Sequence, residues 1–158
     1  MLSSFSILLS PFIVGHFPGG TDHPIFPVLE PKGGVPSGFE WEFDQGPDFY
    51  MDRATRPNDE QTVAGIYFGL HPNRFIASDL AKTEEGIVAG RAVTWAVSDP
   101  PRCRLRRETY LPYQQSPRHL GLQLHVWVTA ADELQLREVM EALKALTFIE
   151  VTRSAQAP

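Results

Sequence analysis

The sequence predicts an α+β domain: an antiparallel meander sheet of about five strands, with a C-terminal helix packed on one face and an extended Pro/Gly-rich N-terminal arm. Two patterns near the C-terminus indicate this class. Apolar and polar residues alternate over residues 120–129, as in a half-buried strand. From Leu136 onward the apolar residues recur at helical spacing, which places one stripe of a helix against a core. The stripe consists of Leu136, Val139, Met140, Leu143 and Leu146.

Length and charge limit the class of protein. The chain has 158 residues, of which 42% are hydrophobic and 21% charged, as is typical of one globular domain. Its formal net charge of -5 would repel a phosphate backbone, whereas nucleic-acid-binding proteins concentrate Lys and Arg on a basic face. We therefore expect no nucleic-acid partner.

The N-terminal segment predicts an arm. Residues 1–38 are rich in proline, which removes an amide donor, and in glycine, which adds backbone entropy. We expect this arm to precede an α+β domain over residues 39–151 and a polar tail over residues 152–158. Its apolar side chains have to be buried, either on the domain itself or against another chain. They are Phe12, Ile13, Phe17, Ile25, Phe26, Val28 and Leu29.

An apolar run over residues 5–14 resembles a signal peptide only in part. No Lys or Arg precedes it, Pro11 interrupts it, and no A-x-A-like cleavage site follows it. It is also shorter than the roughly 20 apolar residues that span a bilayer. We expect no membrane span and favour the cytoplasm; the alternative is a signal remnant in an exported protein.

The strands of the domain are expected in order from Phe39. Turn residues separate the candidate strands, which are 39–43, 49–53, 62–69, 87–97, 104–111 and 120–129. Short connections favour antiparallel pairing in a meander, since parallel pairing requires long crossovers. Residues 73–82 predict a short helix with Phe75, Ile76 and Leu80 facing inward. Residues 84–86 predict a tight turn into the strand at 87–97.

The C-terminal helix carries its own start signal. The Asp132 side chain can accept hydrogen bonds from the free amides of the first turn, and Gln135 occupies the capping-box position. Lys144 in the last turn complements the helix dipole. We expect the helix over residues 132–147, followed by an extended piece at 148–151.

Three short segments carry a family resemblance. They are Gly46-Pro47-Asp48-Phe49-Tyr50, the run from Gly65 to Asn73, and His125-Val126-Trp127-Val128 before the capped helix. They are similar to segments of small uncharacterised bacterial α+β domains, and the layout of residues 39–151 resembles the PsbP and Mog1 type. The resemblance implies a fold used for docking and assembly more than for catalysis. It transfers no functional residue.

The cysteine and the nearby arginines leave alternatives open. Cys103 is the single cysteine, so no internal disulfide can form. It is either a small apolar filler or, with its thiol pKa lowered by the flanking arginines, a reactive thiolate. Of the four arginines, three share one strand face and Arg107 points to the other. That cationic face is either solvated or binds an anion or acidic partner. The arginines are Arg102, Arg104, Arg106 and Arg107.

Signatures of cofactor and metal sites are missing from the sequence. The five histidines lack metal-site spacing, and no glycine-rich phosphate loop or G-x-S-x-G elbow occurs. Asp44 and Asp48 bracket a Gly-Pro turn and are best explained by turn formation. We therefore expect no metal and no cofactor.

One strand face remains as a candidate site. His125 and Trp127 lie opposite the apolar face of their strand. Together with Tyr110, Arg106 and Glu108 they could line a shallow groove for a ligand or partner, unless the arm covers this face. The sequence favours a non-enzymatic binding or interaction module, with a protein partner or a homo-oligomer formed through the arm. The alternative is a small hydrolase or transferase that uses His125 with a neighbouring carboxylate such as Glu108.

Overall fold

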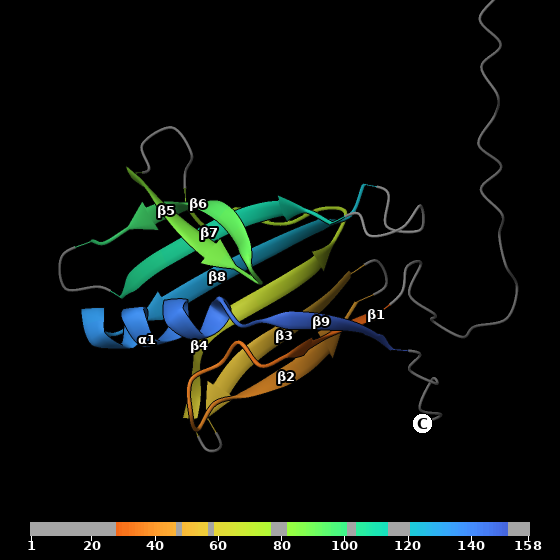
Figure 1. Ribbon diagram of the computed structural model, residues 1–158, viewed down its shortest axis with the longest axis horizontal. Coiled ribbons are helices and arrows are strands. Elements are labelled where there is room, and N and C mark those ends of the chain that lie inside the picture. The colour runs from red at the N-terminus through yellow and green to blue at the C-terminus, as the bar shows by residue number, and fades with distance from the viewer. Residues whose placement is uncertain are drawn as a thin grey trace, which may run out of the picture.

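Nine strands and one helix make up the part of the chain that the structure describes (Figure 1). The computed structural model describes residues 28–46, 49–56, 59–76, 82–100, 104–113 and 121–151. The elements are β1 (Val28–Lys32), β2 (Glu40–Gln45), β3 (Phe49–Arg56), β4 (Asp59–Gly69), β5 (Lys82–Val88), β6 (Arg91–Ser98), β7 (Leu105–Pro112), β8 (Gln123–Ala130), α1 (Glu133–Leu143) and β9 (Thr147–Val151).

The strands form two antiparallel sheets. The larger sheet has seven strands in the order β2-β3-β4-β8-β7-β6-β5, and β1 pairs with β9 in a separate two-stranded sheet. The seven-stranded sheet therefore consists of two meanders, β2-β3-β4 and β5-β6-β7-β8, which are joined where β8 pairs with β4. Antiparallel pairing is confirmed, but the single meander is not.

The predicted fold class is wrong. The described residues are mostly β, and the sheet has seven strands instead of about five with a helix on one face. The error lies in the segment 87–97, which was expected to be one strand. A turn at Ala89 and Gly90, both with positive φ (50° and 71°), divides this segment between β5 and β6. Residues 84–86, expected as a turn, belong to β5.

The prediction of a helix over residues 73–82 is also wrong for the residues of this range that the structure describes. Residues 73–76 are not helical, and Lys82 begins β5. Ile76 is buried as expected, but Phe75 is half exposed, and Leu80 lies outside the described residues. The amides of Phe75 and Ile76 donate to the side chain of Glu108, which holds this non-helical segment against β7.

One face of the large sheet carries the core. The apolar residues of β8 on this face, Leu124, Val126 and Val128, share a buried cluster with Val139 and Leu143 of α1. The helix contacts β8 and β5, and the two-stranded sheet continues the cover along the same side (Figure 1). The opposite side, which carries Tyr67, His125 and Tyr110, is called the outer face below.

The ends of α1 are held by specific hydrogen bonds. The N-cap prediction is confirmed, because the Asp132 carboxylate accepts from the Gln135 amide at 2.8 Å. At the other end, the Ala89 and Gly90 amides of the β5–β6 turn donate to the carbonyls of Leu143 and Lys144, at 2.9 and 3.2 Å. The turn that the sequence did not reveal therefore satisfies carbonyl groups that a helix leaves without partners.

Part of the predicted arm belongs to the domain. Residues 28–32 form β1, and Val28 and Leu29 are buried in the core cluster. The Leu29 amide donates to the Tyr50 hydroxyl on β3 at 2.8 Å. Residues 1–27, which include the arm's other apolar side chains, lie outside the described residues.

The contact between Leu29 and Tyr50 predicts the stability of a variant. Tyr50→Phe deprives a buried amide of its acceptor, which costs about 1–3 kcal/mol of unfolding free energy. Urea denaturation of the full chain measures this loss. As a control, Tyr67→Phe removes a hydroxyl that accepts from the exposed His71 amide. It should cost less than about 0.5 kcal/mol, because water can replace the hydroxyl there. Equal losses in the two variants would contradict the account.

Candidate functional site

The five residues expected at the site lie on the outer face of two neighbouring strands. In the register of β7 and β8, Tyr110 pairs with His125, Glu108 with Trp127, and Arg106 with Thr129. Because directly paired residues of an antiparallel sheet point to the same side, these side chains form adjacent rows. All five residues therefore lie on one face, but Tyr110 and His125 do not line the pocket on it.

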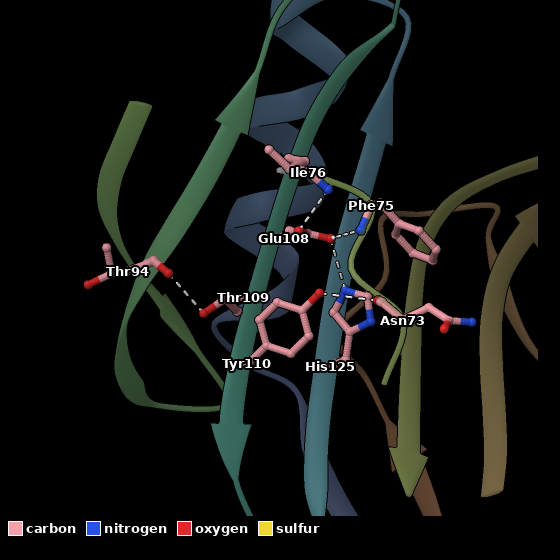
Figure 2. Close-up of polar contacts among 8 residues, drawn as sticks. All are labelled: Asn73, Phe75, Ile76, Thr94, Glu108, Thr109, Tyr110 and His125. Carbon is pink, nitrogen blue, oxygen red and sulfur yellow. Dashed lines mark hydrogen bonds and ion pairs between the residues drawn. The ribbon is translucent and has the colours of Figure 1, made fainter. Parts of the chain in front are cut away.

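The loop of residues 71–76 crosses this face and closes it over His125. The two carboxylate oxygens of Glu108 accept from backbone amides of the loop, Oε2 from Phe75 and Oε1 from Ile76, each at 2.9 Å. The Tyr110 hydroxyl donates to the carbonyl of Asn73 at 3.1 Å. Figure 2 shows these bonds joining the loop to Glu108 and Tyr110 of β7. The face is therefore closed here by a neighbouring loop.

A buried hydrogen bond between a histidine and a carboxylate lies beneath the loop. His125 Nε2 is 3.2 Å from Glu108 Oε2, and the two side chains are 1% and 2% exposed. Burial lowers the pKa of His125, and the charge and hydrogen bond of Glu108 only partly oppose this effect. The imidazole is therefore neutral near pH 7. Since a carboxylate oxygen can only accept, the hydrogen of the neutral imidazole lies on Nε2, which donates a hydrogen bond to Glu108.

Aromatic rings enclose the imidazole. Tyr110 stacks on it with ring centroids 4.3 Å apart and an interplanar angle of 10°. Phe75 and Trp127 pack against it at 5.1 and 5.2 Å. Burial, followed by the negative charge of Glu108, raises the pKa of Tyr110 above its usual value, so its hydroxyl stays protonated as a donor.

A glycine on the next strand determines where Trp127 lies. Gly65 of β4 is directly paired with Trp127, and a Cβ atom at residue 65 would lie 1.9 Å from Cζ2 of the indole. The indole therefore rests on the bare backbone of β4, which any larger residue would prevent. Trp127 is turned toward β4, and space is left beside it over β7.

That space is a small pocket of about 210 Å³ next to the buried pair. The loop of residues 71–76 forms one wall of the pocket, and β7 and β8 form the rest of its lining. The side chains on the outer face that line it are Phe75, Ile76, Arg106, Glu108, Trp127 and Thr129. Arg106 is exposed and forms no ion pair within the described ranges. The pocket therefore combines aromatic walls with an uncompensated cation.

Arg107, the next residue along β7, points to the opposite face of the sheet. Arg107 is buried there, with its guanidinium Nε 2.6 Å from Glu84 and Nη1 2.5 Å from Asp99. Burial lowers the pKa of Arg107, but the hydrogen bonds and charges of Asp99 and Glu84 outweigh this effect and raise it. Arg107 is thus a structural cation. Arg102 and Cys103, the residue for which a reactive thiol was one alternative, lie outside the described residues.

Sequence reasoning missed the loop and the glycine. Phe75 and Ile76 were expected on a short helix, and nothing in their spacing indicates that their backbone amides bind Glu108. Gly65 gave a usable signal, because a glycine inside a strand often marks the close approach of another group. That signal alone does not say which residue approaches.

Comparison of the chain with family models, curated proteins and solved structures finds no match in any of the three. The resemblance to the PsbP and Mog1 type therefore stays a prediction. Within the described ranges, no cluster of three or more His, Cys, Asp or Glu side chains could hold a metal ion. In the same ranges no helix has the length and apolar character needed to cross a membrane.

The lowered pKa of His125 predicts a pH dependence of stability. Below about pH 6.5 the unfolded chain gains a proton on this histidine that the folded chain resists, so the unfolding free energy falls as the pH falls. Between pH 7 and pH 5 this contribution reaches at most about 2 kcal/mol. Urea denaturation at several pH values measures it.

His125→Gln should flatten this part of the profile, because the glutamine amide can still donate to Glu108 but does not titrate. The ionisable groups that face the imidazole, Glu108, Tyr110 and Tyr67, are unchanged in this variant. His71→Gln, which alters an exposed histidine, is the matched control and should leave the profile as in the wild type. A profile that His125→Gln does not flatten would contradict the buried neutral imidazole.

Proposed function

We propose that this protein is a non-enzymatic binding module whose ligand site is the pocket between the loop of residues 71–76 and β7–β8. One observation carries the proposal. The groups that could perform acid-base chemistry, His125 and Glu108, are buried and bonded to each other and to the loop. At the adjacent pocket, the charged side chain that forms no ion pair with any described residue is Arg106.

The hydrogen bonds of Glu108 support a structural role. Its carboxylate accepts from the amides of Phe75 and Ile76 and from His125 Nε2, so three donors compensate its charge. A carboxylate held in this way orients the loop. A general base needs a lone pair that can reach a substrate proton at about 2.6–3.2 Å, and His125 does not line the pocket.

A hydrolase or transferase using His125 is the second candidate. The observation that favours it is the 3.2 Å contact between Nε2 and Glu108, which would orient an imidazole for proton transfer. In this arrangement Nδ1 would have to meet the substrate. The enclosing rings of Phe75, Tyr110 and Trp127 weigh against such a contact, because the loop would have to open first.

The arm could still dock on a protein partner or on a second copy of the chain. This proposal now concerns residues 1–27 alone. Val28 and Leu29, two of the apolar residues that had to be buried, are buried within the domain. They are therefore unavailable for another chain. A truncation that tests the arm has to begin at Val28, so that β1 is retained.

Binding to three small probes tests the pocket directly. Phenylacetate, phenylacetamide and phenethylammonium share one ring and differ in charge. Titration of the full 15N-labelled chain should give saturable shifts at Phe75 and Trp127 with at least one probe. Nuclear Overhauser contacts should join that probe to Phe75 and Trp127.

A pocket-filling variant provides the contrast. Thr129→Phe places a ring in the pocket and should abolish the shifts. Thr83→Phe alters an exposed residue of β5 that does not line the pocket, and it should preserve the shifts. Absence of binding by all three probes would overturn the proposal. Direct contacts between a probe and the His125 ring would favour the enzymatic candidate instead.

A further inference from the structure

We infer that the pocket binds a small free organic acid that carries one flat apolar group. Its carboxylate would pair with Arg106 and its apolar body would lie against Phe75 and Trp127. This inference rests on the proposed function and deepens it by assigning the chemical class of the ligand. It follows from the charge, the shape and the size of the pocket.

Arg106 supplies the anion-binding group. Its side chain is exposed at the pocket and has no carboxylate partner in the described part of the chain. A guanidinium is planar and always charged, and it binds a carboxylate through two parallel hydrogen bonds. Thr129 lies directly across the β7–β8 register from Arg106, so its hydroxyl is placed to donate to the same anion.

The opposite end of the pocket is apolar. Phe75 and Trp127 meet edge to face, with ring centroids 5.4 Å apart and an interplanar angle of 82°. Phe75 remains 52% exposed although it packs on two rings. A flat ligand group in the pocket would cover apolar surface on Phe75 and Ile76, and aromatic contacts favour such offset and edge-on arrangements.

The surrounding charges favour an anion over a cation. Glu108 is the only acidic side chain of the described residues that lines the pocket, and it is 2% exposed with both oxygens bonded. Its burial and its three hydrogen bonds leave an incoming ammonium group little access to it. Arg107 also borders the pocket, but its guanidinium is bonded to Glu84 and Asp99.

The volume limits the ligand to a small molecule. About 210 Å³ is below the range of roughly 300–1,000 Å³ that is usual for pockets that enclose drug-sized ligands. One ring with a short acidic arm suits this volume. A free acid therefore fits better than the C-terminal residue of a peptide, which brings further backbone.

The three probes of the pocket test also decide the class of ligand. Phenylacetate should bind at least about tenfold more tightly than phenylacetamide, because a charge-assisted bidentate pair is stronger than a neutral hydrogen bond. Phenethylammonium should bind most weakly. Added salt should weaken the binding of phenylacetate more than that of the amide.

Two arginine variants provide the matched contrast. Arg106→Gln should weaken the binding of phenylacetate far more than that of phenylacetamide, and so remove most of the difference between the two probes. Arg104→Gln makes the same change of charge at a residue that does not line the pocket, and it should preserve the difference. The wild-type dispersion of the 15N spectrum verifies that each variant is folded.

The outcomes separate this inference from the proposed function. If phenylacetamide or phenethylammonium binds as tightly as phenylacetate, the anion assignment is wrong and the pocket remains a binding site. If no probe binds, both are wrong. N-acetylglycylphenylalanine serves as a fourth probe, and binding tighter than that of phenylacetate would overturn the free acid in favour of a peptide terminus.

Discussion

The buried carboxylate of Glu108 is the constraint on which the outer face depends. Transfer of an ionised carboxylate from water into a protein interior is unfavourable unless hydrogen bonds compensate its charge. Here the compensation comes from two separate parts of the chain, the amides of Phe75 and Ile76 and the imidazole of His125. The carboxylate therefore requires the loop to lie where it does, and the loop in turn excludes water from the carboxylate.

This arrangement connects the fold to the proposed binding site. The backbone bonds to Glu108 fix Phe75 beside Trp127, and Gly65 allows the indole to lie close against the backbone of β4. The pocket is what remains between the loop and the strands. Its wall is thus formed before any ligand arrives, which lowers the ordering cost of binding. The groups capable of proton transfer support the proposed site, and Arg106 at its edge forms no ion pair with the described residues.

The sequence predicted some features well for physical reasons. Strict alternation along β8 placed His125 and Trp127 on one face, and the Asp132 cap identified the start of α1. The fold class failed because residues 87–97 alternate across a turn at Ala89 and Gly90, so two strands looked like one. Pairing of β8 with β4 and the path of the loop depend on contacts between distant residues, which periodicity does not encode.

Amide hydrogen exchange at Phe75 and Ile76 tests the central claim most directly. The account predicts that both amides are protected in the wild-type protein, although they lie in a loop outside any strand. In Glu108→Gln one carboxylate oxygen is replaced by an NH2 group, which cannot accept, so at least one of the two amides should lose its protection. Val126, in the centre of the sheet, should stay protected in both proteins. Exchange of both loop amides at the rate of an unstructured chain in the wild type would contradict the account.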